Sequence, residues 1–200
     1  MLPDIALIFI VLAPGLAALI AGLGKWAIGD RGAMLVTTGT VCLAGLLSLV
    51  QLFAYTFGGD SHGGGAATHA LALATAAEAA SAHHSGSHVI TLMNWLDVGG
   101  FKADWAIRVD ALSIVMMAVI TSVSGLVHVY SWGYMADDPH RGRFFTYLSL
   151  FTFTMLMLVV ADNFLQLFFG WEGVGLASYL LIGFWFTKPA PNDAAIKAFV

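Results

Sequence analysis

The sequence is poor in charge: only 10% of its 200 residues are Asp, Glu, Lys or Arg, whereas 59% are hydrophobic. A soluble domain carries about 25% charged residues, so this composition argues against a water-soluble globular protein. The mean hydropathy is +0.84, and several apolar runs approach the roughly 20 residues that a helix needs to cross a bilayer. The missing charge and the long apolar runs together predict a polytopic membrane protein.

Three further absences exclude other interpretations. The one cysteine, Cys42, cannot form a disulfide within the chain and says nothing about the redox compartment. The formal net charge is −4 and no basic run is present, which argues against nucleic acid as a partner. The N-terminus has no basic segment and no Ala-x-Ala cleavage site, so we expect the first apolar run to stay in the membrane.

Motifs for common cofactors and catalytic centres are absent as well. The sequence contains no phosphate-binding loop, no Cys-x-x-Cys, no Gly-x-Ser-x-Gly and no His-Glu-x-x-His. No two histidines have haem-ligand spacing within an apolar run. We therefore expect this chain to bind no cofactor and no metal, and to have no redox or hydrolytic site of its own.

The apolar runs predict an all-α polytopic membrane protein with five transmembrane helices and the start of a sixth. The five spans are expected at residues 5–23, 33–57, 110–134, 143–161 and 163–186, and the sixth helix from residue 194. Residues 25–32 are expected to form a turn. Asp110 is placed to cap the third span and Asn163 the fifth. Pro189 and Pro191 are expected to stop the fifth helix.

Two segments between the second and third spans do not read as membrane helices. Residues 89–109 alternate in character around Gly99-Gly100 and predict a β-hairpin, with Trp95 and Trp105 suited to a membrane–water interface. Residues 58–88 are rich in Gly, Ala, Ser and His and predict a loop.

The histidines of this loop suggest a metal-binding tract for Zn²⁺ or Ni²⁺. They are His62, His69, His83, His84 and His88. A solvated loop is the favoured interpretation, because no cysteine or carboxylate cluster completes a ligand set.

Lysines and arginines predict the orientation, because cytoplasmic loops are enriched in them. If the N-terminus faces outward, Lys102 and Arg108 lie outside and the other six of the eight basic residues lie inside. We therefore expect the N-terminus, the His-rich loop and the hairpin on the periplasmic side of a bacterial inner membrane. The corresponding regions are two N-terminal helices (1–57), the outer loop (58–88), the hairpin with helix three (89–140) and the remaining helices (141–200).

One charged residue, Glu172, lies within the fifth predicted span, NFLQLFFGWEGVGLASYLLIGFWF. At about 1.5 Å per residue it lies roughly 13 Å from the helix start, close to the bilayer midplane. A carboxylate there costs about 2.5 kcal/mol or more unless it is paired, hydrated or protonated. We favour a proton carrier over a structural acid that is permanently paired with a base. Lys197 is the nearest candidate for a charge partner.

A helical projection gives this span two faces. Gly170, Gly173 and Ala177 form a stripe of small residues that predicts close approach of a neighbouring helix. Glu172 lies roughly opposite. Its own face is shared by Leu165, Phe168, Gly175, Leu176, Tyr179 and Gly183. A second intramembrane group, His128, is a candidate proton relay, although a hydrogen bond to a neighbouring helix is the favoured interpretation.

Four runs resemble a known family. ADNFLQLFFGWEGVGLASYLLIGFW is similar to the fifth helix of the L subunit of bacterial NADH:quinone oxidoreductase (respiratory complex I), whose mitochondrial counterpart is subunit 5. VDALSIVMMAVITSVSGLVHVYSWGYM resembles the third helix of that family, RFFTYLSLFTFTMLMLVVADN the fourth, and AAIKAFV the start of the sixth. Specific motifs cover residues 95–200, and the first two spans match by pattern.

The resemblance implies a proton-translocating membrane subunit coupled to quinone reduction elsewhere in the complex. By motif position, Glu172 is the family's fifth-helix glutamate, which works with a lysine on the seventh helix, and Lys197 is its sixth-helix lysine. Residues 89–140 then form the subunit 5-type N-terminal region, and residues 141–200 begin the antiporter-like domain. Because no seventh helix is present, we expect an N-terminal part of a longer protein.

The same resemblance implies the cofactors and partners. NADH, FMN, iron–sulfur clusters and quinone would be bound elsewhere in the complex, and the partners would be its other membrane subunits and the lipid bilayer. Two alternatives stay open: a subunit of a multisubunit Na⁺/H⁺ antiporter, and a structural membrane subunit in which Glu172 only locks helix packing. The runs WEGVG and VHVYSWGYM favour complex I over the antiporter.

Overall fold

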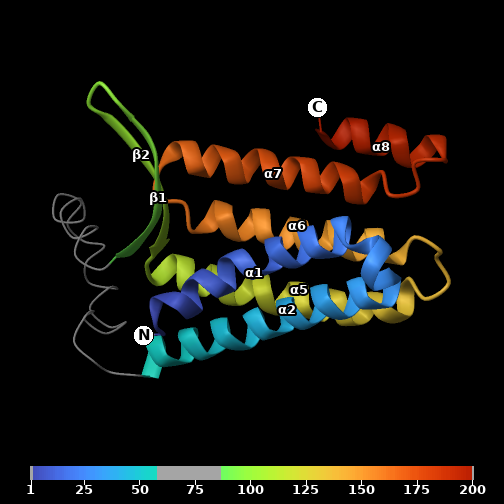
Figure 1. Cartoon of the computed structure of the whole chain (residues 1–200), viewed down its shortest axis with the longest axis horizontal. Coiled ribbons are helices and arrows are strands. Elements are labelled where there is room, and N and C mark those ends of the chain that lie inside the picture. The colour runs from blue at the N-terminus through green and yellow to red at the C-terminus, as the bar shows by residue number, and fades with distance from the viewer. Residues whose placement is uncertain (1, 58–86, 200) are drawn as a thin grey trace, which may run out of the picture.

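A computed structural model of the chain describes residues 2–57 and 87–199. In chain order its elements are α1 (Asp4–Leu23), α2 (Lys25–Phe57), β1 (His88–Val98), β2 (Phe101–Val109), α5 (Ala111–Tyr134), α6 (Arg141–Val159), α7 (Phe164–Ile182) and α8 (Pro189–Phe199). The long helices run side by side, and the hairpin stands at one end of the bundle (Figure 1). Most of the predicted His-rich loop, with His62, His69, His83 and His84, lies outside the described residues.

Within the described residues, five helices are long and apolar enough to cross a membrane: α1, residues Ile28–Phe57 of α2, α5, α6 and α7. Many of their outward side chains are large and apolar. Leu112 is 72% exposed, Leu126 73% and Phe164 89%. Exposed apolar surface on this scale is typical of helices that face lipid. The prediction of a mostly helical fold with five candidate membrane-spanning helices is therefore confirmed.

Both predicted helix caps are present. The Asp110 carboxylate accepts a hydrogen bond from the Ser113 amide at 2.8 Å, and the Ser113 hydroxyl accepts one from the Asp110 amide at 2.7 Å. This reciprocal pair satisfies two amides at the helix start. At the start of α7, the Asn163 side chain accepts a hydrogen bond from the Gln166 amide at 2.9 Å.

The predicted hairpin is also confirmed. Strands β1 and β2 pair antiparallel, with Val98 opposite Phe101 across the turn. Gly99 and Gly100 have φ values of 58° and 93°. A two-residue hairpin turn of this kind needs positive φ at both positions, which glycine adopts without steric cost.

Several helix boundaries differ from the prediction, and α6 spans Arg141–Val159 rather than 143–161. The expected turn at residues 25–32 is helical apart from Gly29, whose φ of 65° and ψ of 177° break the helical path within α2. The fifth helix ends at Ile182 rather than at residue 186, and Gly183 follows as its C-cap. Helix α8 begins at Pro189 rather than at residue 194. Proline fits the first turn of a helix because its missing N–H would have no partner there.

The core lies where α1, α2, α5, α6 and β2 meet. Its largest cluster of buried residues contains Leu7, Ile10, Val11, Ala44, Ile107, Val109, Ile114, Met117, Leu156, Met157 and Val160. Helix α6 packs against α1, α2, α5 and α7, and α8 packs on α7. The hairpin therefore contributes to the same core as the helices, through β2.

The predicted stripe of small residues on α7 packs against α6. A Cβ atom on Gly170 would lie 2.7 Å from the Leu158 backbone, and one on Gly173 would lie 2.7 Å from the Thr154 side chain. Ala177, on the same stripe, is fully buried. The two helices thus approach more closely than residues with larger side chains would allow.

We expect Gly170→Ala to destabilise the chain by about 1–3 kcal/mol, the usual cost of forcing extra volume into a packed interface. The control is Gly39→Ala, because a Cβ at helical Gly39 meets nothing within 4 Å. That control should be neutral or slightly stabilising, since alanine favours helix by up to about 1 kcal/mol over glycine. Thermal unfolding in detergent micelles measures both. Equal midpoints for the two variants would contradict the close contact.

Candidate functional site

Glu172 lies on the face of α7 that α6 leaves uncovered, and its side chain is exposed. The same face receives α8 further along the helix. The Phe199 ring lies 4.0 Å from a Cβ position on Gly175 and its centroid lies 5.7 Å from that of Tyr179. Glu172 is three residues before Gly175, which is about 4.5 Å along the axis. Glu172 therefore lies next to the part of α7 that α8 covers.

Lys197, the predicted charge partner, lies in the last turn of α8 and is exposed. Ala195 of the same helix is buried and lies 3.3 Å from a Cβ position on Gly183. Two residues further on, Lys197 is about 200° around the helix and faces away from α7. Among the salt bridges of the described residues, none joins Lys197 to Glu172. The structure therefore does not bring the two predicted site residues together.

His128 is fully buried in α5. Its Nδ1 donates to the Ser124 carbonyl oxygen at 2.8 Å, so it bonds to its own helix. The Ser124 hydroxyl in turn lies 2.5 Å from the Thr152 hydroxyl of α6. Because Nδ1 carries the hydrogen, Nε2 of the neutral ring is an acceptor, and this buried atom has no hydrogen-bond partner within the described part of the chain.

A group that the sequence did not single out joins β2 to the start of α7. Gln166 is fully buried; its side-chain amide donates to the Ala106 carbonyl at 2.7 Å and accepts from the Ala106 amide at 3.2 Å. The Asn163 side-chain amide donates to the Asp104 carbonyl at 2.7 Å. We call Asn163 and Gln166, together with their three hydrogen bonds to β2, the hairpin clamp. A glutamine within an apolar span predicts a buried polar contact of this kind, because buried polar groups are hydrogen-bonded.

Gln166 of the hairpin clamp lies on the same helix as Glu172, six residues before it. An edge-on contact between the Trp105 and Phe169 rings, with centroids 5.0 Å apart, adds to it. The Arg108 amide also donates to the Val160 carbonyl at 2.9 Å, at the end of α6. The hairpin therefore fixes the position of the first turn of α7 along the helix axis. Because Glu172 lies on the same helix, its position along the bundle is fixed as well.

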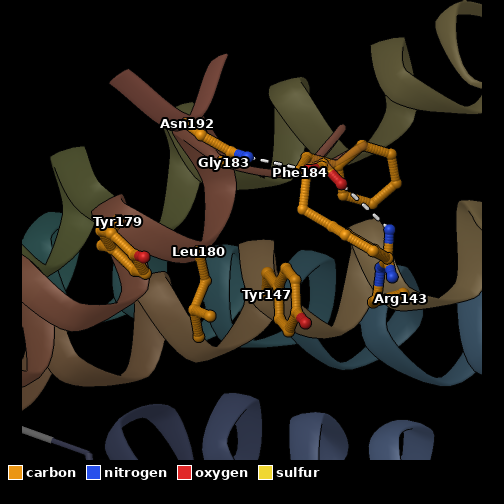
Figure 2. Close-up of a pocket in the computed structure, with 8 residues that line it drawn as sticks. Arg143, Tyr147, Tyr179, Leu180, Gly183, Phe184 and Asn192 are labelled. Atoms are coloured by element: carbon orange, nitrogen blue, oxygen red, sulfur yellow. Dashed lines mark hydrogen bonds between the residues drawn. The ribbon is translucent and has the colours of Figure 1, made fainter. Parts of the chain in front are cut away.

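The opposite end of the bundle holds a second polar group. Arg143, in the first turn of α6, donates to the Phe184 carbonyl at 3.0 Å (Figure 2). Nearby, Asp138 accepts from the His140 amide at 2.7 Å and from the Trp185 indole at 3.0 Å. The His140 amide is the main cause that lowers the pKa of Asp138 below its usual 3.8, and the Trp185 bond acts in the same direction.

The described residues offer no constellation for a metal ion. Among them, no three His, Cys, Asp or Glu residues come together. His88, the described member of the His-rich loop, lies 2.9 Å from the Asp4 carboxylate. The expectation that the chain binds no metal and no cofactor stays a prediction.

Comparison with known proteins finds two family models that each match part of the chain. One family model, described as NADH:quinone oxidoreductase/Mrp antiporter, TM, matches residues 161–200, which include Glu172. The segment that carries Glu172 is therefore similar to a membrane region that this model describes for both oxidoreductase and antiporter sequences. A second model, described as NADH-ubiquinone oxidoreductase (complex I), chain 5 N-terminus, matches residues 95–145.

Similar proteins from different organisms carry one of two names, NADH-quinone oxidoreductase subunit L or NADH-ubiquinone oxidoreductase chain 5. NADH-quinone oxidoreductase subunit L is 46% identical over 198 residues in Rhodobacter capsulatus and 45% identical over 193 residues in Rickettsia felis. NADH-ubiquinone oxidoreductase chain 5 of Phytophthora infestans is 41% identical over 192 residues. Each match covers 96% of this chain and 24%, 26% and 25% of the relative, respectively. The chain is therefore similar over nearly all of its own length to part of subunit L and of chain 5, and it spans about a quarter of the length of these relatives.

We expect Gln166→Leu to loosen the hairpin from α7, because it leaves the buried Ala106 amide and carbonyl without their partner. Such a loss costs about 1–3 kcal/mol. Hydrogen exchange of the β2 amides, read by mass spectrometry on the protein in detergent, should become faster. The control Asn94→Ala removes an exposed amide from β1 and should change little. Unchanged exchange at β2 in Gln166→Leu would mean that the clamp does not hold the strand.

Proposed function

We propose that this chain is part of a proton-translocating membrane subunit of an NADH:quinone oxidoreductase. The observation that carries the proposal is the placement of Glu172: a carboxylate within a membrane-spanning helix, on the face that α6 leaves open. The relatives are named as subunits of NADH-quinone and NADH-ubiquinone oxidoreductases, which supports the same function.

In this function Glu172 takes up and releases a proton. A carboxylate in a low-dielectric setting responds strongly to nearby charge, because burial favours the neutral form and a cation favours the ionised form. A change in charge on a neighbouring group therefore shifts the proton on Glu172, and the coupling acts in both directions. Lys197 is the proposed charge partner, with its side chain brought to the acid by a change in rotamer or by movement of α8.

His128 is proposed as a second proton-handling group. Its buried Nε2 is an acceptor, and the Ser124 and Thr152 hydroxyls continue the polar contact from α5 to α6. Redox chemistry takes place elsewhere in the complex: NADH, FMN, iron–sulfur clusters and quinone belong to other subunits, and this chain has no redox site.

The proposed setting is a bacterial inner membrane, with the N-terminus and the hairpin on the periplasmic side. Helix α8 is the start of a sixth membrane span. Residues 89–140 form the subunit 5-type N-terminal region and residues 141–200 begin the antiporter-like domain. Other membrane subunits of the complex and the lipid bilayer are the partners. The positive-inside distribution of lysine and arginine supports this orientation.

The alternative of a subunit of a Na⁺/H⁺ antiporter is not favoured. One matching model describes both oxidoreductase and antiporter sequences. The relatives that match 96% of the chain, however, are named as oxidoreductase subunits. An experiment can distinguish a purely structural role of Glu172 from proton transfer, because a structural role predicts that loss of the acid impairs assembly rather than proton transfer.

We expect Glu172→Gln to lower NADH-driven proton pumping severely in membrane vesicles that contain the full subunit and its complex. Glutamine keeps the shape but cannot take up a proton, and a proton-transferring side chain contributes about 10²–10⁴-fold to the step that it serves. Glu172→Asp keeps the proton-binding group and should be milder. Pumping is measured with a pH-sensitive dye and normalised to the amount of assembled complex.

The matched control is Asp137→Asn, which removes one exposed carboxylate outside the spans and should leave pumping unchanged. Normal pumping in assembled Glu172→Gln would contradict the proton-carrier role. Loss of assembly in Glu172→Gln together with normal pumping per assembled complex would support the structural alternative.

For His128 the informative pair is His128→Gln and His128→Phe. Glutamine can keep a hydrogen bond to the Ser124 carbonyl, whereas phenylalanine keeps only the packing against Phe145, whose ring centroid lies 6.0 Å from that of His128. If His128 relays protons, both variants should pump more slowly, because neither side chain titrates. If it only stabilises α5, His128→Gln should pump normally in the same vesicle assay.

A further inference from the structure

We propose that the pocket beside Arg143 binds the phosphate headgroup of an anionic phospholipid. This site lies at the end of the bundle away from the hairpin and does not depend on the role of Glu172. The pocket has a volume of about 150 Å³, roughly five times the 30 Å³ that a water molecule occupies in the liquid. A phosphate group therefore fits into it.

Three helices and one loop build the pocket (Figure 2). Arg143 and Tyr147 come from α6, Tyr179 from α7, and Asn192 from α8, while Phe184 belongs to the loop between α7 and α8. The lining thus combines one cation, two phenol hydroxyls and one amide. These groups are hydrogen-bond donors, which is what the oxygens of a phosphate require.

The guanidinium of Arg143 is held in a defined position. Its central carbon lies 4.8 Å from the centroid of the Phe184 ring and 4.9 Å from that of the Phe186 ring. A hydrogen bond from Nη2 to the Phe184 carbonyl completes this arrangement. Rings and carbonyl together leave the guanidinium little freedom, so binding an anion costs little side-chain entropy.

Arg143 also has donors to spare. A guanidinium carries five N–H groups, and the one hydrogen bond that Arg143 donates within the described residues is that from Nη2 to the Phe184 carbonyl. Among the salt bridges of the same residues, none includes Arg143. Arg143 is one of the charges that lower the pKa of Asp138, whose oxygens already accept from the His140 amide and the Trp185 indole. A phosphate matches the unused face of the guanidinium, because it accepts two parallel hydrogen bonds.

The position of the pocket favours a lipid over other sources of phosphate. It lies where α6 and α8 begin and α7 ends, at the end of the bundle where Arg141, Arg143 and Lys188 occur. Outward side chains of the same helices are apolar and exposed, with Leu176 at 50% and Ile196 at 53%, and can accommodate acyl chains. In the orientation proposed above, this end of the bundle faces the cytoplasm. The cytoplasmic leaflet is enriched in anionic lipids, and basic pockets between helices on that side bind their headgroups.

The test uses the complex with its full subunit, reconstituted into phosphatidylcholine vesicles that contain a photoactivatable phosphatidylglycerol. Mass spectrometry of the cross-linked peptides locates the label. We expect labelling of residues 183–199 in the wild type, and about tenfold less in Arg143→Gln, because glutamine cannot form the charge-assisted hydrogen bonds of the guanidinium to a phosphate in the pocket. A photoactivatable phosphatidylcholine should label this segment much less than phosphatidylglycerol does.

The matched control is Arg141→Gln, which removes the same charge two residues away and outside the pocket lining. It should retain most of the labelling. Equal losses in Arg141→Gln and Arg143→Gln, or equal labelling by the two lipids, would overturn the proposal. Inorganic phosphate in excess should leave the labelling unchanged; its loss would assign the pocket to a soluble phosphate and likewise overturn the lipid proposal.

Two further variants keep the test decisive if Arg143→Gln fails to assemble. Arg143→Lys keeps the charge but loses the planar fork that stacks between the rings, so its labelling should be intermediate. Tyr147→Phe removes a single hydroxyl from the pocket and should lower labelling without affecting assembly. Wild-type labelling in both variants would show that neither the fork nor the hydroxyl holds the lipid.

Discussion

The close contact between α6 and α7 determines where the ionisable group of the fifth span lies. Gly170 and Gly173 bring α7 so close to α6 that a Cβ atom at either position would lie 2.7 Å from Leu158 or Thr154. Glu172 is two residues after Gly170 and therefore about 200° around the helix. The packing of one face thus turns the acid outward, toward the side on which α8 runs back along α7. A rotation of α7 that moved Glu172 toward α6 would remove its room for water or for a partner side chain.

Hydrogen bonds between helices supply the specificity that lipid-facing apolar surface cannot. The hydroxyls of Ser48 and Thr121 join α2 to α5 at 2.5 Å, and the Ser149 hydroxyl donates to the Pro14 carbonyl at 2.9 Å between α6 and α1. Lipid tails are as apolar as leucine, so burying apolar side chains between helices gives no hydrophobic driving force, whereas each polar contact contributes about 0.6 kcal/mol on average. The hairpin clamp serves the same purpose at one end of the bundle, where Gln166 satisfies both backbone groups of Ala106.

The parts of the fold that depend on local chemistry were predictable from the sequence. The five spans follow from apolar length, the caps at Asp110 and Asn163 from short polar side chains at helix starts, and the hairpin from two adjacent glycines that tolerate positive φ. The boundaries at Lys25, Ile182 and Pro189 were not predictable to the residue. A helix end depends on what the last turn contacts: here the residues after Ile182 leave the helix, and the Phe184 carbonyl accepts a hydrogen bond from Arg143 on another helix.

For the candidate site, the sequence by itself determined that a carboxylate lies within the fifth span and that small residues line the opposite face, because both follow from composition and a 3.6-residue period. Only the tertiary structure decided what these residues meet. It placed the small-residue face on α6 and left Glu172 exposed. It turned Lys197 away, since Ala195 takes the contact with α7. It also assembled the pocket around Arg143 from three helices. The physical reason is that each of these contacts joins residues distant in the chain, and their pairing depends on how whole helices pack.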